Sequence, residues 1–228
     1  MQRRTILDSV TSVALLAAAV VVLWVNGPRL FVAKTEGLPK VAMPKEPLDL
    51  GGRALHGNSS ADTVLIEFAD VQCPFCAAFS RQTMPEIETR YVSTGKLLVG
   101  FVHVPLSIHP FALRAAQSLE CADSQGAFWT LLPLLFDSPG SQLSDIVVRD
   151  SAQRLGLNLA VFDLCLQQPP SEKIEKDRKM AEALGVKGTP FFVIGRRLSD
   201  GRVRATALID GARPTPEFTR ILDAATAK

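Results

Sequence analysis

The stretch that decides the fold runs from Val64 to Phe79 and reads Val-Leu-Ile-Glu-Phe-Ala-Asp-Val-Gln-Cys-Pro-Phe-Cys-Ala-Ala-Phe. Residues 63–68 have the apolar character of a strand, and a short polar turn then leads into two cysteines and a helical pattern. Cys73 falls at the predicted N-cap. Pro74 takes the first helical position, where proline is favoured because its missing N–H would be unpaired anyway. With Cys76 one turn further along, the sequence places two thiols where a strand meets a helix.

This position favours redox chemistry for the cysteine pair. A thiolate at Cys73 would face unpaired backbone N–H groups and the positive end of the helix dipole, and both lower a cysteine pKa. Haem attachment requires a histidine after the second cysteine, where Ala77 stands. A zinc site requires four clustered ligands, but Cys121 and Cys165 stand far apart in the sequence and the three histidines are scattered. We therefore expect no metal and no cofactor, and a purely structural disulfide is the alternative.

The first residues carry a membrane-targeting signal. Arg3 and Arg4 precede an apolar segment whose last part, Val13 to Val25, has no charge. We predict an uncleaved transmembrane anchor over residues 1–25, with a cleaved signal peptide as the alternative. The proline-containing residues 26–47 are predicted to be a tether. The rest of the chain, 48–228, then lies outside the cytoplasm as one domain.

Charge and cysteine content limit the functions of the exported part. Residues 1–34 hold four of the 25 basic and one of the 23 acidic residues, so the remainder carries 21 basic and 22 acidic residues. This balance gives no reason to expect nucleic-acid binding. Four cysteines in an exported protein allow three disulfide pairings, of which spacing favours Cys73 with Cys76 and Cys121 with Cys165.

Hydrophobic periodicity predicts the order of elements along the chain. A strand lies within 48–56 and another within 63–68, and a helix over 74–91 is expected to kink at Pro85. A near-continuous apolar strand over 97–104 completes a βαβ unit. The remaining predictions are helices over 111–122, 127–136, 143–155, 159–167 and 171–184, strands over 191–195 and 203–209, and a last helix over 216–225. The sequence thus describes an α/β frame with an all-helical block inserted at about 110–184.

Two motifs together resemble one family. Glu67-Phe-Ala-Asp-Val-Gln-Cys-Pro-Phe-Cys76, followed much later by Gly188-Thr189-Pro190, is similar to the DsbA-type thiol:disulfide oxidoreductases of the thioredoxin superfamily. The resemblance covers the chain from about residue 48 to its end. It implies a thioredoxin-like fold, with βαβ and ββα halves, into which a helical domain is inserted. The membrane anchor and the tether are additions to that pattern.

The resemblance also implies roles for the residues of these motifs. Cys73 would be the exposed nucleophile, and Cys76 the buried partner that closes or resolves the mixed disulfide. Pro190 would be a cis-proline across from the cysteines. The Thr189 backbone would then pair with an extended substrate peptide, which Pro74 and Phe75 also contact. Pro74-Phe75 departs from the Pro-His of the best-known members, which leaves the strength of the oxidant open.

Three further residues receive roles by resemblance, each with an alternative. Glu67 looks like the buried acid beneath the redox centre, where burial would raise its pKa and let it exchange protons with Cys76. The alternative is a glutamate on a solvated strand face. Cys121 and Cys165 resemble a second, non-catalytic disulfide of the helical domain. Free cysteines packed in a core are the alternative.

The resulting hypothesis is a membrane-anchored oxidoreductase at the periplasmic face of a bacterial inner membrane. It would act as a dithiol oxidase on exported, unfolded or partly folded proteins, and a quinone-linked membrane oxidase would re-oxidise it. A reductase or isomerase of the same fold is the nearer alternative. A tethered chaperone or scaffold, with a purely structural cysteine pair, is the alternative from a different class.

Overall fold

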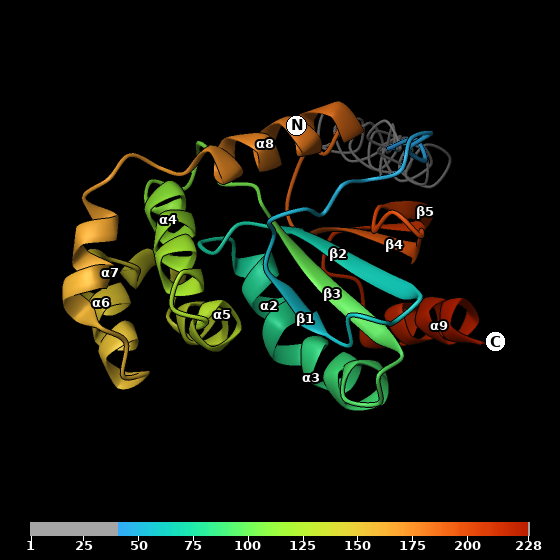
Figure 1. The fold of residues 1–228 in the computed structure, drawn as a ribbon, viewed down its shortest axis with the longest axis horizontal. Helices are drawn as coiled ribbons and strands as arrows, with labels where there is room; N and C mark the ends of the chain where they lie inside the picture. Colours follow the sequence, from blue (N-terminus) through green and yellow to red (C-terminus); the bar gives the residue numbers. More distant parts are fainter. Residues whose placement is uncertain (1–40, 228) are drawn as a thin grey trace, which may run out of the picture. The chain divides into compact units, whose positions relative to one another are not determined.

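The computed structural model describes residues 41–227. Five strands form one mixed sheet in the order β1-β3-β2-β4-β5 (Figure 1). The parallel pair β2–β3 lies at its centre, as a strand-helix-strand order predicts, and the other neighbours are antiparallel. The strands are β1 (Leu55–Gly57), β2 (Thr63–Ala69), β3 (Leu97–His103), β4 (Phe191–Arg197) and β5 (Val203–Asp210).

The helices follow the sequence prediction closely, except that the first predicted helix is divided into shorter ones. The first predicted helix is replaced by α2 (Pro74–Gln82), α3 (Met84–Ile87) and a π-helical turn over Glu88–Val92. Five helices separate β3 from β4, and one follows β5. These are α4 (Ala112–Asp123), α5 (Phe128–Asp137), α6 (Asp145–Arg154), α7 (Leu159–Leu166), α8 (Glu172–Leu184) and α9 (Thr215–Thr226).

Every residue of β2 and β3 is buried, because helices cover both faces of the sheet. On one face, Ile66 and Phe68 pack with Ala181 of α8. On the other, Leu65 packs with Phe79 of α2 and with side chains of α9. Figure 1 shows α8 on one side of the sheet and α2, α3 and α9 on the other. Since side chains alternate along a strand, Glu67 points to the same face as Leu65.

The helical insertion builds its own apolar core, which is continuous with the start of α2. Buried side chains of α4, α5, α6 and α7 form one cluster with Val71, Cys73 and Cys76. Leu131 and Leu135 of α5 are completely buried within it. The cysteine pair therefore lies where the thioredoxin-like sheet and the helical insertion meet.

The structure corrects two expectations about local structure. The first strand, predicted within 48–56, is confined to Leu55–Gly57, and Leu48 instead makes an isolated bridge to Val203. The first helix does not kink at Pro85 but breaks at Thr83, two residues earlier. Pro85 lies in the first turn of the new helix α3, where its missing N–H leaves no helical hydrogen bond unmade.

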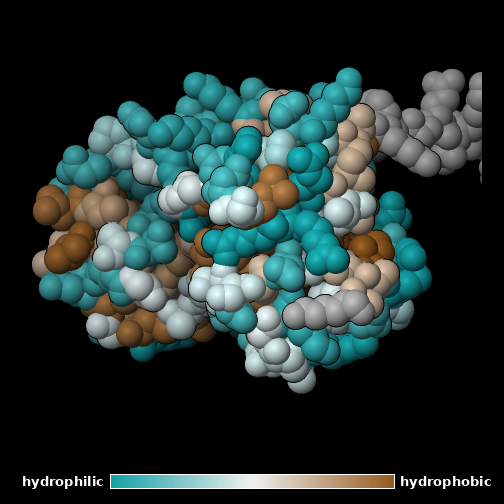
Figure 2. All heavy atoms as spheres, turned by 45° about the vertical axis from the view of Figure 1, so that its right-hand side comes forward, coloured by the Kyte–Doolittle hydropathy of each residue, from teal (hydrophilic) through white to brown (hydrophobic). Residues whose placement is uncertain are grey.

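The membrane anchor predicted over residues 1–25 lies outside the described residues, as does most of the tether. Among residues 41–227, no helix has both the length and the apolar character that crossing a bilayer requires. Most of the surface in view is hydrophilic (Figure 2). Ile146, Val161 and Leu164, on α6 and α7, are exposed apolar side chains at the far end of the insertion.

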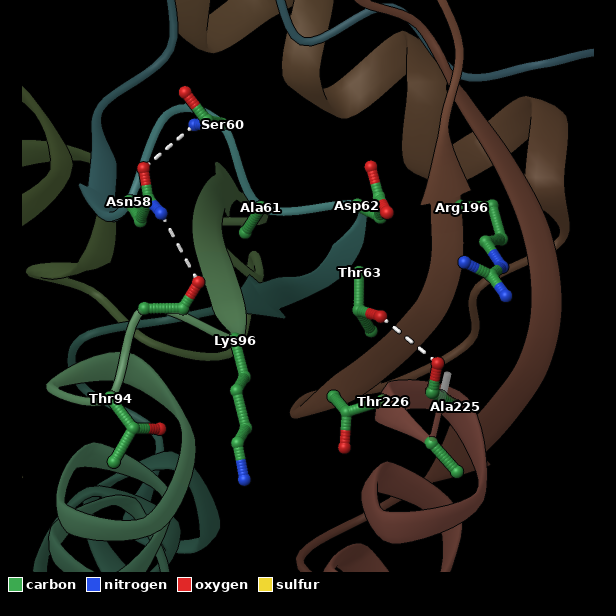
Figure 3. Close-up of a pocket in the computed structure, with 12 residues that line it drawn as sticks. Asn58, Ser60, Ala61, Asp62, Thr63, Thr94, Lys96, Arg196, Ala225 and Thr226 are labelled. Atoms are coloured by element: carbon green, nitrogen blue, oxygen red, sulfur yellow. Dashed lines mark hydrogen bonds between the residues drawn. The ribbon is translucent and has the colours of Figure 1, made fainter.

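A polar hollow of about 480 Å³ lies at the opposite end of β2 from the cysteines (Figure 3). The Thr63 hydroxyl, where β2 begins, donates to the Ala225 carbonyl of α9 at 3.1 Å. Asn58 donates to the Gly95 carbonyl at 3.2 Å. Lys96 and Arg196 at its rim are exposed. The hollow holds no cysteine, and in sheets of this kind ligands bind beyond the carboxyl ends of the parallel strands, where Cys73 lies.

Candidate active site

The two cysteines occupy the turn from β2 into α2. Cys73 is the N-cap residue with extended backbone angles, and its carbonyl accepts from the Ala77 N–H at 3.1 Å. Both Cys73 and Cys76 are unbonded to any other cysteine. Cys73 is only 3% exposed, so the expectation of an exposed nucleophile is wrong for this state. In this state its thiol is turned inward and donates to the Thr189 carbonyl at 3.3 Å, while Phe75 is 65% exposed.

The surroundings of Cys73 favour its thiolate. They lower the pKa of Cys73 to about 5, chiefly through a hydrogen bond from the Cys76 thiol. Burial opposes this shift, and hydrogen bonds from Thr189 and from the backbone N–H groups of Cys76 and Phe75 add to it. The Thr189 hydroxyl is buried and has no hydrogen-bond partner within residues 41–227, so it is free to donate to a thiolate.

Cys76 and Glu67 behave in the opposite way. Burial, followed by the interactions with Cys73 and with the Glu67 charge, raises the pKa of Cys76 well above its usual value. Glu67 is 3% exposed, which excludes a solvated strand face, and burial raises its pKa to about 8. These opposite shifts favour a charge on Cys73 over one on Cys76, and they favour a protonated Glu67 at neutral pH.

Thr189 and Pro190 face the cysteines from the entry into β4. The peptide bond between them is cis. The position of Thr189 against the Cys73 sulfur brings together two motifs that are 116 residues apart in the sequence. The predicted site residues of both motifs thus converge on one place, with Glu67 on the sheet behind Cys76.

Replacing Thr189 by valine is expected to raise the Cys73 pKa. The substitution removes the hydroxyl donor but leaves the backbone donors and Cys76, so the acid dissociation constant should fall by less than about tenfold. The ultraviolet absorbance of the thiolate, followed against pH, measures the change. Thr206→Val is the matched control, because that hydroxyl bonds to the Ile194 carbonyl within the β4–β5 hairpin. An unchanged Cys73 pKa in Thr189→Val would contradict this assignment.

Asp70 supports the active-site turn, a role that the sequence motifs alone do not predict. Its buried carboxylate accepts hydrogen bonds from the Gln72 N–H at 2.7 Å and the Leu106 N–H at 2.8 Å. It also lies 2.7 Å from Nδ1 of His109, which is therefore a partner of this turn rather than part of the helix α4. A polar residue at the carboxyl end of a buried strand is the signal that could have identified Asp70.

Gln72 and Gly140 hold the same turn against the helical insertion. The Gln72 side chain donates to the Gly140 carbonyl at 2.8 Å and accepts from the Phe111 N–H at 2.7 Å. A Cβ atom on Gly140 would lie 2.5 Å from the Gln72 carbonyl oxygen, so only glycine permits this approach. The insertion thereby fixes the loop that carries Cys73.

Cys121 and Cys165 form a disulfide between α4 and α7 in the structure. Cys121 is buried in the core of the insertion. Residues 41–227 contain no group of three or more histidine, cysteine, aspartate or glutamate side chains placed to hold a metal ion.

One class of protein combines a thioredoxin-like sheet, a helical insertion and a cysteine pair beside a Thr-Pro bond. These are the DsbA-type protein thiol:disulfide oxidoreductases, and this chain is of that class. It belongs to the thioredoxin family, whose model, described as thioredoxin, matches residues 50–210.

Similar proteins support this placement. The structure of alpha-DsbA1 from Wolbachia pipientis has a TM-score of 0.69 at 28% identity, covering 78% of this chain and 93% of that one. BdbD from Bacillus subtilis, in its oxidised form, shares the fold with a TM-score of 0.66 at 18% identity, covering 81% and 98%. The Na(+)/H(+) antiporter NhaA 3 of Salinispora tropica is 31% identical over 172 residues, which are 74% of this chain and 25% of that protein. The chain thus spans about a quarter of the length of the curated relatives it matches.

Proposed function

We propose that this protein is a membrane-anchored, extracytoplasmic dithiol oxidase that passes a Cys73–Cys76 disulfide to exported proteins. The observation that carries the proposal is the position of Cys73 at the N-cap of α2, beside Thr189 and within reach of the Cys76 thiol, surroundings that lower its pKa to about 5. Any interaction that favours this thiolate stabilises the reduced protein and leaves the disulfide unaffected. The disulfide form is then the less stable one and gives up its oxidising equivalents readily.

The exchange proceeds in two displacements. A substrate thiolate attacks the Cys73 sulfur, a mixed disulfide forms, and the Cys73–Cys76 bond breaks. The Cys76 sulfur leaves and takes a proton from Glu67, which regains one from water. A second substrate thiolate attacks the substrate sulfur of the mixed disulfide, and Cys73 leaves as a thiolate. The substrate loses two electrons and two protons. Cys76 keeps one proton, and the other remains in solvent.

Substrate binding is assigned to the surface around Cys73. Pro74 and Phe75 are exposed beside the buried sulfur, and an apolar ring at this position suits unfolded chains that still expose apolar side chains. The Thr189 backbone lies next to the same sulfur and would pair with an extended peptide, reading its main chain and not its side chains. A site of this kind accepts many sequences.

The oxidase requires a partner that restores its disulfide. We assign this role to a quinone-linked membrane oxidase, because the anchor over residues 1–25 and the tether over 26–47 would keep the domain at the membrane. Arg3 and Arg4, at the start of this segment, support an orientation that leaves the domain on the extracytoplasmic side. There, disulfides persist.

The reduction potential, measured against mixtures of reduced and oxidised glutathione, tests the direction. The pair should stay mainly reduced in a buffer that oxidises ordinary protein dithiols. Above pH 5, only Cys76 takes up a proton when the disulfide is reduced, so the potential should fall by about 30 mV per pH unit. Below pH 5, both cysteines take up a proton, and the fall should be about 59 mV per pH unit. A pair held as disulfide by reducing glutathione buffers would instead indicate a reductase, and the oxidase assignment would be wrong.

A further inference from the structure

A histidine and a buried carboxylate form a polar pair beside Cys73. Nδ1 of His109 lies 2.7 Å from Oδ2 of Asp70, whose side chain has no exposed surface. The backbone carbonyl of Asp70 accepts the Cys73 N–H at 3.0 Å. His109 and Cys73 therefore contact the same residue, one through its carboxylate and the other through its main chain.

The hydrogen bonds of Asp70 determine which nitrogen of the His109 ring is basic. Oδ2 of Asp70 also accepts the Leu106 N–H at 2.8 Å and is therefore an acceptor, so Nδ1 of the ring donates to it. In the neutral ring, Nε2 then carries the lone pair. Within residues 41–227, Nε2 makes no hydrogen bond, and the His109 side chain is 18% exposed. The pair thus presents a basic nitrogen near the surface.

Holding the loop after β3 does not require a histidine. The Leu106 N–H bonds to the Asp70 carboxylate, and the Phe111 N–H bonds to the Gln72 side chain at 2.7 Å. These two bonds already fix the segment on both sides of His109 to the active-site turn. An imidazole adds a group that accepts and releases protons under physiological conditions, which no loop contact needs.

His109 also lines a pocket of about 450 Å³ at the edge of the sheet that carries the cysteine pair. The pocket is bounded by the loop after β3 and by the end of α8, and it includes Val186, shortly before Thr189. In sheets of this kind ligands bind beyond the carboxyl ends of the parallel strands, and β2 and β3 both end here. Arg178 and Glu182 of α8 line the pocket too, but neither bonds to the ring. A substrate segment that carries the reacting thiol has room beside His109.

We propose that His109, oriented by Asp70, is a general base that takes the proton from a substrate thiol as this thiol attacks Cys73. The proposal rests on the proposed function, because the thiol belongs to the protein that is oxidised. Nε2 accepts the thiol proton, the substrate sulfur bonds to the Cys73 sulfur, and the Cys73–Cys76 bond breaks. The Cys76 sulfur leaves and is protonated, and the imidazolium returns the substrate's proton to solvent.

The gain comes from the low acidity of substrate thiols. The thiolate is the reactive form, and a free cysteine with a pKa of about 8.5 is only about 3% ionised at pH 7. Attack assisted by a base also uses the protonated thiol, which allows an acceleration of up to about thirtyfold. Unfolded chains offer thiols of this ordinary acidity, so one base serves many substrates.

His109→Gln in the full chain tests the base, because the glutamine amide can still donate to Asp70 but has no basic nitrogen. The oxidised protein is mixed near neutral pH with 2-mercaptoethanol, whose thiol is then protonated, or with 4-mercaptobenzoate, whose aryl thiol is already ionised. Loss of the Cys73–Cys76 disulfide is followed by acid quenching and thiol alkylation. We expect the initial rate with 2-mercaptoethanol to fall about tenfold, and the rate with 4-mercaptobenzoate to change by less than about twofold.

His56→Gln is the matched control. Nε2 of His56 also lies 2.8 Å from a carboxylate, that of Glu88, but His56 does not line the pocket. Its rates with both thiols should equal those of the unaltered protein. His109→Ala provides a second variant, in which the space left by the ring admits imidazole. Added imidazole should restore the rate with 2-mercaptoethanol and leave the rate with 4-mercaptobenzoate unchanged.

Two results would refute the base. Equal slowing with both thiols in His109→Gln would mean that the side chain only holds the turn, and unchanged rates with both would mean that it takes no part in the exchange. Because both thiols are small molecules, the test is independent of protein oxidation. If the selective loss is found while the unaltered protein fails to oxidise reduced, unfolded substrates, the role of His109 stands and the dithiol oxidase function falls.

Discussion

Cys73→Ser is expected to abolish thiol–disulfide exchange, with a loss of at least about 10³-fold in the oxidation of a reduced, unfolded substrate. The reaction requires a sulfur that accepts attack and leaves as a thiolate. A serine hydroxyl forms no disulfide, and the single remaining thiol at Cys76 is buried and protonated. The appearance of disulfides in the substrate, followed by thiol labelling, measures the loss.

Cys76→Ala should give a different result, which separates an enzyme from a scaffold. The Cys73 pKa should rise in this variant, because the Cys76 thiol no longer donates to it. Cys73 can still attack a substrate disulfide, which forms a mixed disulfide and releases one substrate thiolate. No second thiol is then present to displace the bound substrate, so mixed disulfides should accumulate. Cys121→Ala/Cys165→Ala is the control, because it removes two cysteines of the insertion and leaves the exchange pair intact. A Cys73→Ser protein that oxidises substrates normally would disprove the enzyme, and a Cys76→Ala protein that captures none would indicate a scaffold.

Local patterns are sufficient to predict the framework of the fold. Residues 63–69 and 97–103 form buried central strands because both carry continuous apolar runs, which only a sheet covered on two faces can use. The helices of the insertion begin and end within two residues of the predicted bounds, since glycine and proline mark their limits. The approach of Thr189 to Cys73 was predictable only through the resemblance of the two motifs to the DsbA-type proteins, since no local pattern places them together.

The remaining features depend on contacts between distant residues, which no local pattern reveals. Asp70 holds the active-site turn through partners in the loop that follows β3, more than thirty residues later. The apolar ring of Trp129 predicts a core residue, but its indole N–H is buried without a hydrogen-bond partner among residues 41–227. The burial of Cys73 likewise follows from the Thr189 carbonyl, to which its sulfur turns. Sequence periodicity predicts where helices and strands lie along the chain, whereas the direction of an individual side chain also depends on its neighbours from other elements.

Glu67→Gln is expected to stabilise the protein at alkaline pH and to have little effect in acid. The comparison is best made in a Cys73→Ala/Cys76→Ala background, in which neither thiol titrates. Glu67 is protonated in the folded protein up to about pH 8, but an unfolded glutamate loses its proton near pH 4.5. Between these values the folded state binds more protons than the unfolded state, so the free energy of unfolding falls as pH rises.

The size of this effect follows from the same two pKa values. The parent should lose about 4 kcal/mol of stability between pH 4.5 and pH 8, and the loss should level off above that range. Glutamine resembles the protonated acid and does not titrate, so the variant should show no such loss. Urea unfolding at several pH values measures the difference, with Glu86→Gln as the exposed control. A constant difference between Glu67→Gln and its parent from pH 5 to pH 9 would mean that Glu67 is not held protonated, and the proton that Cys76 receives would then require another source.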